Sequence, residues 1–127
     1  MTELRKHIRY KTLAKAKIEG ASEGETLLRD ISITGCRVEC TSYADIKPNV
    51  RYKLEVIPED AAKIDEFELM VELSWTHTEG YSCEIGFTIA EFPKKKLFKR
   101  YVDYLAWRYS KGNSMTGSSA PGVPPVV

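Results

Sequence analysis

The stretch Glu66-Phe-Glu-Leu-Met-Val-Glu-Leu-Ser-Trp75 alternates apolar and polar side chains along its length. Successive side chains of an extended strand point to opposite faces of a sheet, so this stretch predicts a strand with one apolar face. That face is expected to hold Phe67, Leu69, Val71, Leu73 and Trp75. Residues 82–90 repeat the pattern, and the link Thr78-Glu-Gly80 supplies a glycine for a tight turn. The two runs therefore predict a β-hairpin.

Four further segments, residues 14–19, 26–32, 36–41 and 51–56, complete a set of about six strands. One-sided strands with short connections favour an antiparallel sheet that closes on itself. A small barrel buries the apolar faces and removes the open sheet edges. The longer links at 42–50 and 58–65 have room for a helical turn each, which Pro48 and Pro58 keep short. The predicted fold class is mainly β, an antiparallel six-stranded barrel.

The pattern changes to helical spacing after Pro93. Pro93 suits a helix start and Gly112 a helix end, so we expect an amphipathic C-terminal α-helix of about four turns. Its apolar side chains are Leu97, Phe98, Tyr101, Val102, Leu105 and Tyr109. Residues 113–127 are rich in Ser, Gly and Pro and are expected to form a flexible tail. The predicted organisation is an N-terminal arm (1–12), a barrel with its helix (13–112) and the tail (113–127).

Composition narrows the function classes. The chain has 127 residues, enough for one domain, and a net charge of +1, which argues against a general DNA or RNA binder. No apolar run is long enough to span a membrane, and the polar N-terminus does not resemble a secretion signal, so a cytoplasmic location is expected. Cys36, Cys40 and Cys83 are expected to be reduced thiols. No metal-ligand spacing, nucleophile or acid pair is evident, so we predict neither metal, cofactor nor enzymatic activity.

Arg5 and Arg9 lie four residues apart, just before the first predicted strand. Guanidinium groups present planar sets of donors that match phosphate oxygens and the O6/N7 edge of guanine. Two of them on a mobile arm can grip opposite parts of one ligand. The same pair also fits a solvated basic N-terminus without a ligand.

A second motif, Asp30-Ile-Ser32-Ile-Thr-Gly35, falls where one predicted strand gives way to the next. The carboxylate of Asp30 can accept hydrogen bonds from guanine N1–H and N2–H, and Ser32 can both donate and accept. Gly35 permits a positive φ or a close backbone approach to a ligand. Asp, Ser and Gly are also ordinary turn formers, so an unliganded turn explains this motif equally well.

Together the two motifs resemble the bipartite ligand motif of PilZ domains, Arg5-x-x-x-Arg9 followed by Asp30-x-Ser32-x-x-Gly35. Val71-Glu-Leu-Ser-Trp75 and Glu84-Ile-Gly86-Phe are similar to late strands of that family, and a helix after the last strand is common there. The resemblance covers residues 5 to about 109 and implies a six-stranded PilZ-type barrel that binds cyclic di-GMP.

The resemblance implies that Arg5 and Arg9 clamp the ligand against a fixed surface formed by Asp30, Ser32 and Gly35. Further candidates for ligand contact are Leu4, Lys6, His7 and Trp75. In the family, a hydrophobic residue at the position of Leu4 goes with one bound ligand rather than an intercalated pair. His7 is either a solvated spacer or a ring that stacks on a base, and Trp75 either packs in or at the rim of the barrel or flanks the site.

The resemblance implies a bacterial, non-catalytic adaptor whose changed surface is read by a protein partner, with motility, biofilm formation or virulence as possible outputs. An alternative is a ligand-independent PilZ-like protein-interaction module. A barrel that binds single-stranded nucleic acid ranks last, because most aromatic residues fall on the inner faces. The basic run Lys94-Lys-Lys96, with Lys99 and Arg100, is either a solvated face or a docking patch for an acidic partner.

Overall fold

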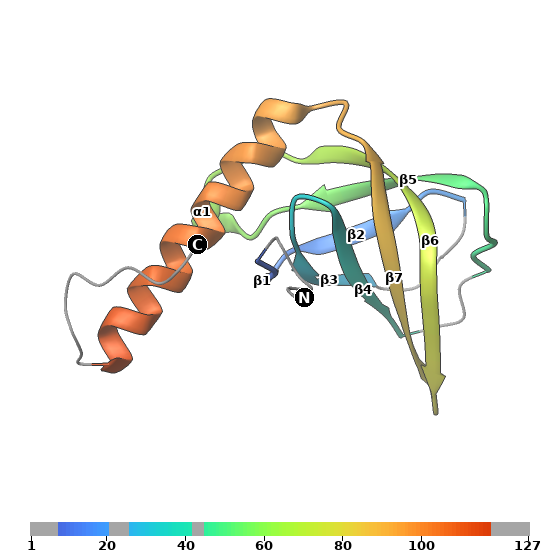
Figure 1. The fold of residues 1–127 in the computed structure, drawn as a ribbon, viewed down its shortest axis with the longest axis horizontal. Coiled ribbons are helices and arrows are strands. Elements are labelled where there is room, and N and C mark those ends of the chain that lie inside the picture. Colours follow the sequence, from blue (N-terminus) through green and yellow to red (C-terminus); the bar gives the residue numbers. More distant parts are fainter. Residues whose placement is uncertain (1–7, 21–25, 42–44, 118–127) are drawn as a thin grey trace, which may run out of the picture.

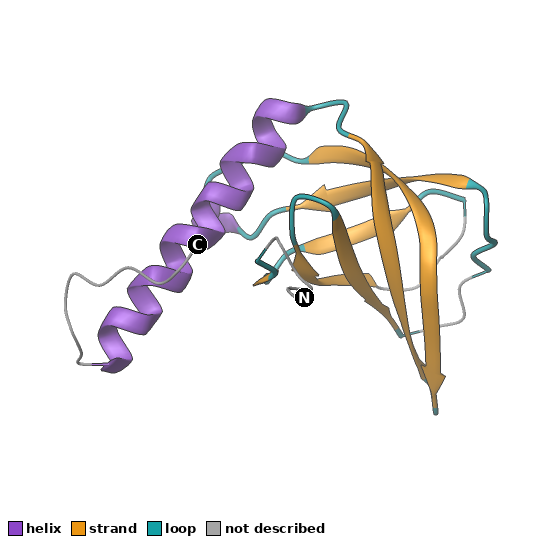
Figure 2. Ribbon diagram, in the orientation of Figure 1, coloured by secondary structure: helices purple, strands orange, loops and turns teal. Residues whose placement is uncertain are grey.

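The computed structural model describes residues 8–20, 26–41 and 45–117, and for residues 112–117 only the backbone is described. Its strands are β1 (Tyr10–Lys11), β2 (Lys15–Ile18), β3 (Thr26–Ile31), β4 (Gly35–Cys40), β5 (Arg51–Ile57), β6 (Phe67–Glu79) and β7 (Ser82–Glu91). A short 3-10 turn, η1, spans Asp60–Ala62, and the helix α1 spans Lys95–Gly117. The strands and helix are shown in Figures 1 and 2.

Strands β2 to β7 close into an antiparallel barrel in the order β2-β3-β4-β7-β6-β5, and β5 pairs back with β2. This confirms the predicted six-stranded barrel with a C-terminal helix. The two-residue β1 pairs with the end of β3, beyond the stretch that pairs with β2. β1 and β2 therefore follow the same edge of β3, and β1 places Lys11 opposite Asp30.

The alternating pattern of the sequence explains the core. Apolar side chains of β2 to β7 point inward, and their polar neighbours point outward. The inward set is fully or almost fully buried and includes Ile18, Leu28, Val38, Leu54, Leu69 and Ile85. Gly80 provides the positive φ, +62°, that the predicted β6–β7 turn requires. Of the two helical turns that the longer links allow, the described residues show the one in the 58–65 link, as η1.

Helix α1 packs on the barrel through one face, with Phe98, Tyr101 and Leu105 buried. Phe67 of β6 contacts the rings of Phe98 and Tyr101, with centroids 6.2 and 6.0 Å apart. The helix is longer than predicted, since it continues past Gly112 to Gly117. A glycine favours a helix end but does not impose one, because its cost inside a helix is only about 1 kcal/mol.

A polar contact ties the helix to the rest of the fold. The hydroxyl of Tyr101 donates a hydrogen bond to Glu59 at 2.7 Å, and Arg108 pairs with the other carboxylate oxygen of Glu59 at 2.6 Å. Arg108 also donates to the backbone carbonyl of Lys11 in β1 at 2.9 Å. Burial, with the nearby charge of Glu59 acting in the same direction, raises the pKa of Tyr101 far above its usual range, so the phenol remains a donor. The helix is therefore attached both to the barrel and to β1.

Candidate ligand-binding surface

The β3–β4 hairpin carries the Asp30-x-Ser32-x-x-Gly35 motif. Its strands pair Asp30 with Arg37 and Ile31 with Cys36, and a bulge interrupts the ladder between Leu28 and Asp30. A bulge increases local twist and re-aims the side chains beside it. In this hairpin Cys36 points into the core, whereas Asp30 and Arg37 lie on the outer face of the barrel.

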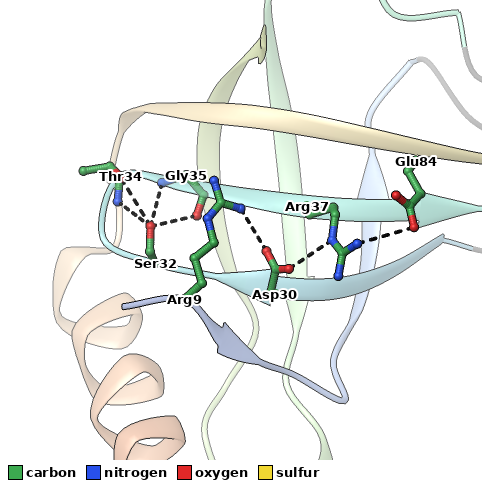
Figure 3. A network of polar contacts seen from close by, with 7 residues as sticks. All are labelled: Arg9, Asp30, Ser32, Thr34, Gly35, Arg37 and Glu84. Atoms are coloured by element: carbon green, nitrogen blue, oxygen red, sulfur yellow. Dashed lines mark hydrogen bonds and ion pairs between the residues drawn. The ribbon is translucent and has the colours of Figure 1, made fainter. Parts of the chain in front are cut away.

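Ser32 holds the turn of this hairpin together. Its side-chain oxygen accepts hydrogen bonds from the backbone N–H groups of Thr34 and Gly35, each at 3.2 Å. Its backbone N–H donates to the carbonyl of Gly35 at 2.8 Å. Ser32 is buried. In this structure the residue fixes the shape of the turn, as Figure 3 shows.

Gly35 is required by a close approach of two strands. A Cβ atom at this position would lie 2.7 Å from the backbone carbonyl oxygen of Phe87 in β7. That oxygen belongs to the strand ladder and cannot move freely, so any side chain would push β4 away from β7. The absence of a side chain here lets the turn close against β7, and Gly35 does not adopt a positive φ.

Asp30 is the centre of a polar cluster that we call the Asp30 cluster, formed by Arg9, Asp30, Arg37 and Glu84 (Figure 3). One carboxylate oxygen of Asp30 pairs with Nη1 of Arg9 at 3.1 Å, and the other with Nε of Arg37 at 3.0 Å. Arg37 also reaches Glu84 of β7 at 3.5 Å. The side chain of Asp30 is 13% exposed and those of both arginines 32%. The cluster thus places two guanidinium groups, both partly buried, around one carboxylate.

Sequence reasoning missed Arg37 and Glu84. The available signal was the alternation of 36–41, which places Arg37 outward, and the antiparallel hairpin, which brings it opposite Asp30. Of the sequence-predicted residues, the structure brings together Arg9, Asp30, Ser32 and Gly35. Arg5 and the further candidates Leu4, Lys6 and His7 lie outside the described residues.

Trp75 extends this surface across the barrel. Its alternation predicts a position on the same face as the core residues, but its side chain is 40% exposed. A register shift between Leu73 and Trp75 explains the difference, because a bulge breaks strict alternation. The indole lies against Gly86, where a Cβ atom would be 2.1 Å from Nε1 of Trp75.

Gly86 pairs with Arg37 on one side and with Trp75 on the other. Asp30, Arg37, Gly86 and Trp75 therefore follow one row across four neighbouring strands. Neighbouring strands lie about 4.8 Å apart, so the row is roughly 14 Å long. It presents a carboxylate, a guanidinium group and a partly exposed indole that covers Gly86.

The thiol beneath this surface has no catalytic character. Burial raises the pKa of Cys36 to about 12, the charge of Asp30 acts in the same direction, and Arg9 opposes them. A thiol of this kind stays protonated and is a poor nucleophile. Within residues 8–20, 26–41 and 45–117, no three His, Cys, Asp or Glu side chains are grouped so that they could hold a metal ion. Nor does any described helix combine the length and hydropathy that crossing a membrane requires.

Comparisons with known proteins identify a structural neighbour. No protein-family model and no curated protein sequence matches the chain. Among solved structures, the inhibitor of motility (MotI/DgrA) of Bacillus subtilis superposes with a TM-score of 0.68 at 15% sequence identity. The match covers 85% of this chain and 52% of that chain, so the protein spans about half the length of its neighbour. The chain therefore has the six-stranded antiparallel barrel with a C-terminal helix that its sequence predicts, and it shares this fold with the Bacillus subtilis inhibitor of motility.

Proposed function

We propose that the protein is a non-catalytic receptor for cyclic di-GMP, which binds across the outer face of β3, β4, β7 and β6. The observation that carries the proposal is the Asp30 cluster, in which a carboxylate lies between two guanidinium groups at one end of a row whose other end is the partly exposed Trp75. A carboxylate accepts from guanine N1–H and N2–H, and guanidinium groups bond to phosphates and to guanine O6 and N7.

We assign the individual residues the following roles, with that of Arg5 taken from the sequence motif. Asp30 receives a guanine edge, Arg37 keeps the carboxylate oriented, and Arg5 and Arg9 bind the phosphates and the outer face of the ligand. Ser32 and Gly35 fix the shape of the β3–β4 turn beside Asp30 and hold it close to β7. The indole of Trp75 offers a stacking surface, and such base–aromatic contacts contribute about 1–3 kcal/mol per base.

In this structure Arg9 donates to one oxygen of Asp30. A guanine that approaches Asp30 from the side of Arg9 displaces this guanidinium group, which is then free to bind a phosphate. The guanine N–H donors replace the bond that Arg9 gives up, so the carboxylate keeps its hydrogen bonds. Arg9 is therefore proposed to exchange its pair with Asp30 for a bond to the nucleotide.

Displacement of Arg9 reaches helix α1 through β1. Tyr10 contacts Tyr109 edge-on at 6.0 Å, and the carbonyl of Lys11 accepts a bond from Arg108. Arg9 itself lines a cavity of about 260 Å³ between β1 and α1. A ligand that moves the arm therefore shifts the helix or its side chains, and a protein partner reads that change. Control of motility is a suitable output, because the structural neighbour is an inhibitor of motility.

The test is isothermal titration calorimetry with cyclic di-GMP. Loss of one charge-assisted bond costs about 1.5–3 kcal/mol, so Arg5→Ala, Arg9→Ala and Asp30→Asn should each weaken binding by roughly tenfold or more. Arg51→Ala is the matched control, since Arg51 pairs with Glu72 and Glu91 on a different part of the barrel. Equal affinity in the wild type and all three site variants would rule out this site.

A ligand-independent interaction module is the second candidate, and one observation favours it. Both oxygens of Asp30 already have guanidinium partners within the chain, so the cluster is satisfied without a ligand. If cyclic di-GMP gives no heat and no chemical-shift change on addition to the wild type, this second function replaces the first.

A further inference from the structure

A groove of about 380 Å³ lies between the first turns of α1 and the β3–β4 turn. Its walls are apolar and come from Ile33, Phe92, Phe98 and Val102, with Lys95, Lys99 and Asp103 at its edge. Ile33 is 46% exposed although it is a large apolar residue. The groove is therefore an apolar hollow on an otherwise polar surface.

The surroundings of the groove are strongly basic. Lys94, Lys95, Lys96, Lys99 and Arg100 are all exposed, and within the described residues none forms an ion pair. The first turn of α1 holds no acidic residue. Cations at a helix N-terminus are repelled by the helix dipole, so this arrangement lowers the stability of the helix. An anionic partner removes that repulsion.

We propose that this groove docks an acidic segment of a partner protein. The segment inserts a large apolar side chain between Ile33 and Val102 and places its carboxylates against Lys95 and Lys99. Charge complementarity selects the acidic partner, and the apolar walls select an anchoring side chain. A peptide is favoured over a lipid surface because Phe92, Phe98 and Val102 are buried or half-buried and line a hollow, whereas Lys95 and Lys99 are exposed. Membrane-binding patches instead present apolar residues that project into the lipid.

The position of Ile33 links the groove to the Asp30 cluster. Ile33 lies between Ser32 and Thr34 in the turn that the side-chain oxygen of Ser32 holds together. The ligand dependence of docking rests on the proposed function, since a nucleotide seated beside this turn is what would move Ile33. Docking itself does not require the nucleotide, because all the residues that line the groove belong to the chain.

The experiment measures fluorescence polarisation with a labelled peptide of glutamates flanking a central Leu-Phe pair, with and without cyclic di-GMP. The doubly substituted variant Lys95→Glu/Lys99→Glu should bind at least roughly tenfold more weakly, because two attractive contacts become repulsive. Lys15→Glu/Lys17→Glu is the matched control, with the same charge change on exposed residues of β2. Val102→Ser, or a peptide with Ser-Ser in place of Leu-Phe, should lose a similar amount.

Three outcomes overturn the proposal. Equal weakening by the two double variants would show general charge attraction, and unchanged binding of the Ser-Ser peptide would show that the groove takes no anchor. Binding to vesicles that contain phosphatidylserine, with no binding of the peptide, would assign the surface to a membrane. If the peptide binds equally well with and without cyclic di-GMP, the groove still docks an acidic segment. That result would contradict only the claim that the nucleotide controls docking. Calorimetry on the same samples tests the receptor function separately.

Discussion

The Asp30 cluster makes a prediction that needs no ligand. Asp30→Asn keeps the shape of the side chain but removes the charge that Arg9 and Arg37 share. A hydrogen bond to a charged group contributes about 1.5–3 kcal/mol when it is shielded, and an exposed ion pair contributes about 0.2–1 kcal/mol. The carboxylate is 13% exposed and both guanidinium groups are 32% exposed, so each pair belongs between these limits.

Taking about 1 kcal/mol for each of the two pairs, we expect Asp30→Asn to lower the free energy of unfolding by about 2 kcal/mol. The assay is urea unfolding at pH 7, followed by far-ultraviolet circular dichroism. Arg37→Gln alone and combined with Asp30→Asn completes a double-mutant cycle, and we expect a coupling energy of about 1 kcal/mol.

Glu72→Gln is the matched control. Glu72 pairs with Arg51 at 2.9 Å, similar in distance to the pairs of Asp30, but the two side chains are 42% and 49% exposed. Glu72→Gln should lower the free energy of unfolding by no more than about 0.5 kcal/mol. If Asp30→Asn and Glu72→Gln destabilise the protein equally, or the cycle shows no coupling, the shielding argument for the Asp30 cluster is wrong.

Three other predictions concern single residues. Gly86→Ala should displace the indole of Trp75, because the added Cβ would lie 2.1 Å from its Nε1. In a Trp107→Phe background, which leaves Trp75 as the fluorescent indole, the tryptophan fluorescence emission should shift to the red. An unchanged emission spectrum would contradict the contact between Trp75 and Gly86. Burial raises the pKa of Cys36 from 9.0 to about 12, so the folded state keeps a proton that the unfolded state loses, and the stabilisation present below pH 9 declines as the pH rises towards 12. Above pH 9 this decline should approach roughly 1.4 kcal/mol per pH unit, and Cys36→Ala should remove it, as alkaline urea titrations can measure. Iodoacetamide should modify the half-buried Cys83 in the native protein and Cys36 only after unfolding, which peptide mass spectrometry would detect; equal labelling would disprove the burial of Cys36.

Much of the fold was predictable because barrel strands alternate strictly. Phe67, Leu69 and Val71 are apolar at every second position, and each is buried where the pattern placed it. The expected inner position of Trp75 and the expected helix end at Gly112 were wrong. Trp75 follows a register shift and lies outward on Gly86, and α1 passes through Gly112, because neither a bulge nor a tolerated glycine leaves a clear mark in the sequence.

The sequence by itself determined the strands, the helical spacing after Pro93 and the local motif around Ser32, because these depend on residues close together in the chain. Tertiary structure alone decided that Arg37 and Glu84 join Asp30 and that Trp75 lies across Gly86. It also decided that Ile33 meets the first turns of α1 to form a groove. Each of these contacts joins different strands or a strand and the helix. Register and closure of the barrel set such contacts, and a one-residue shift would place every side chain of a strand on the opposite face.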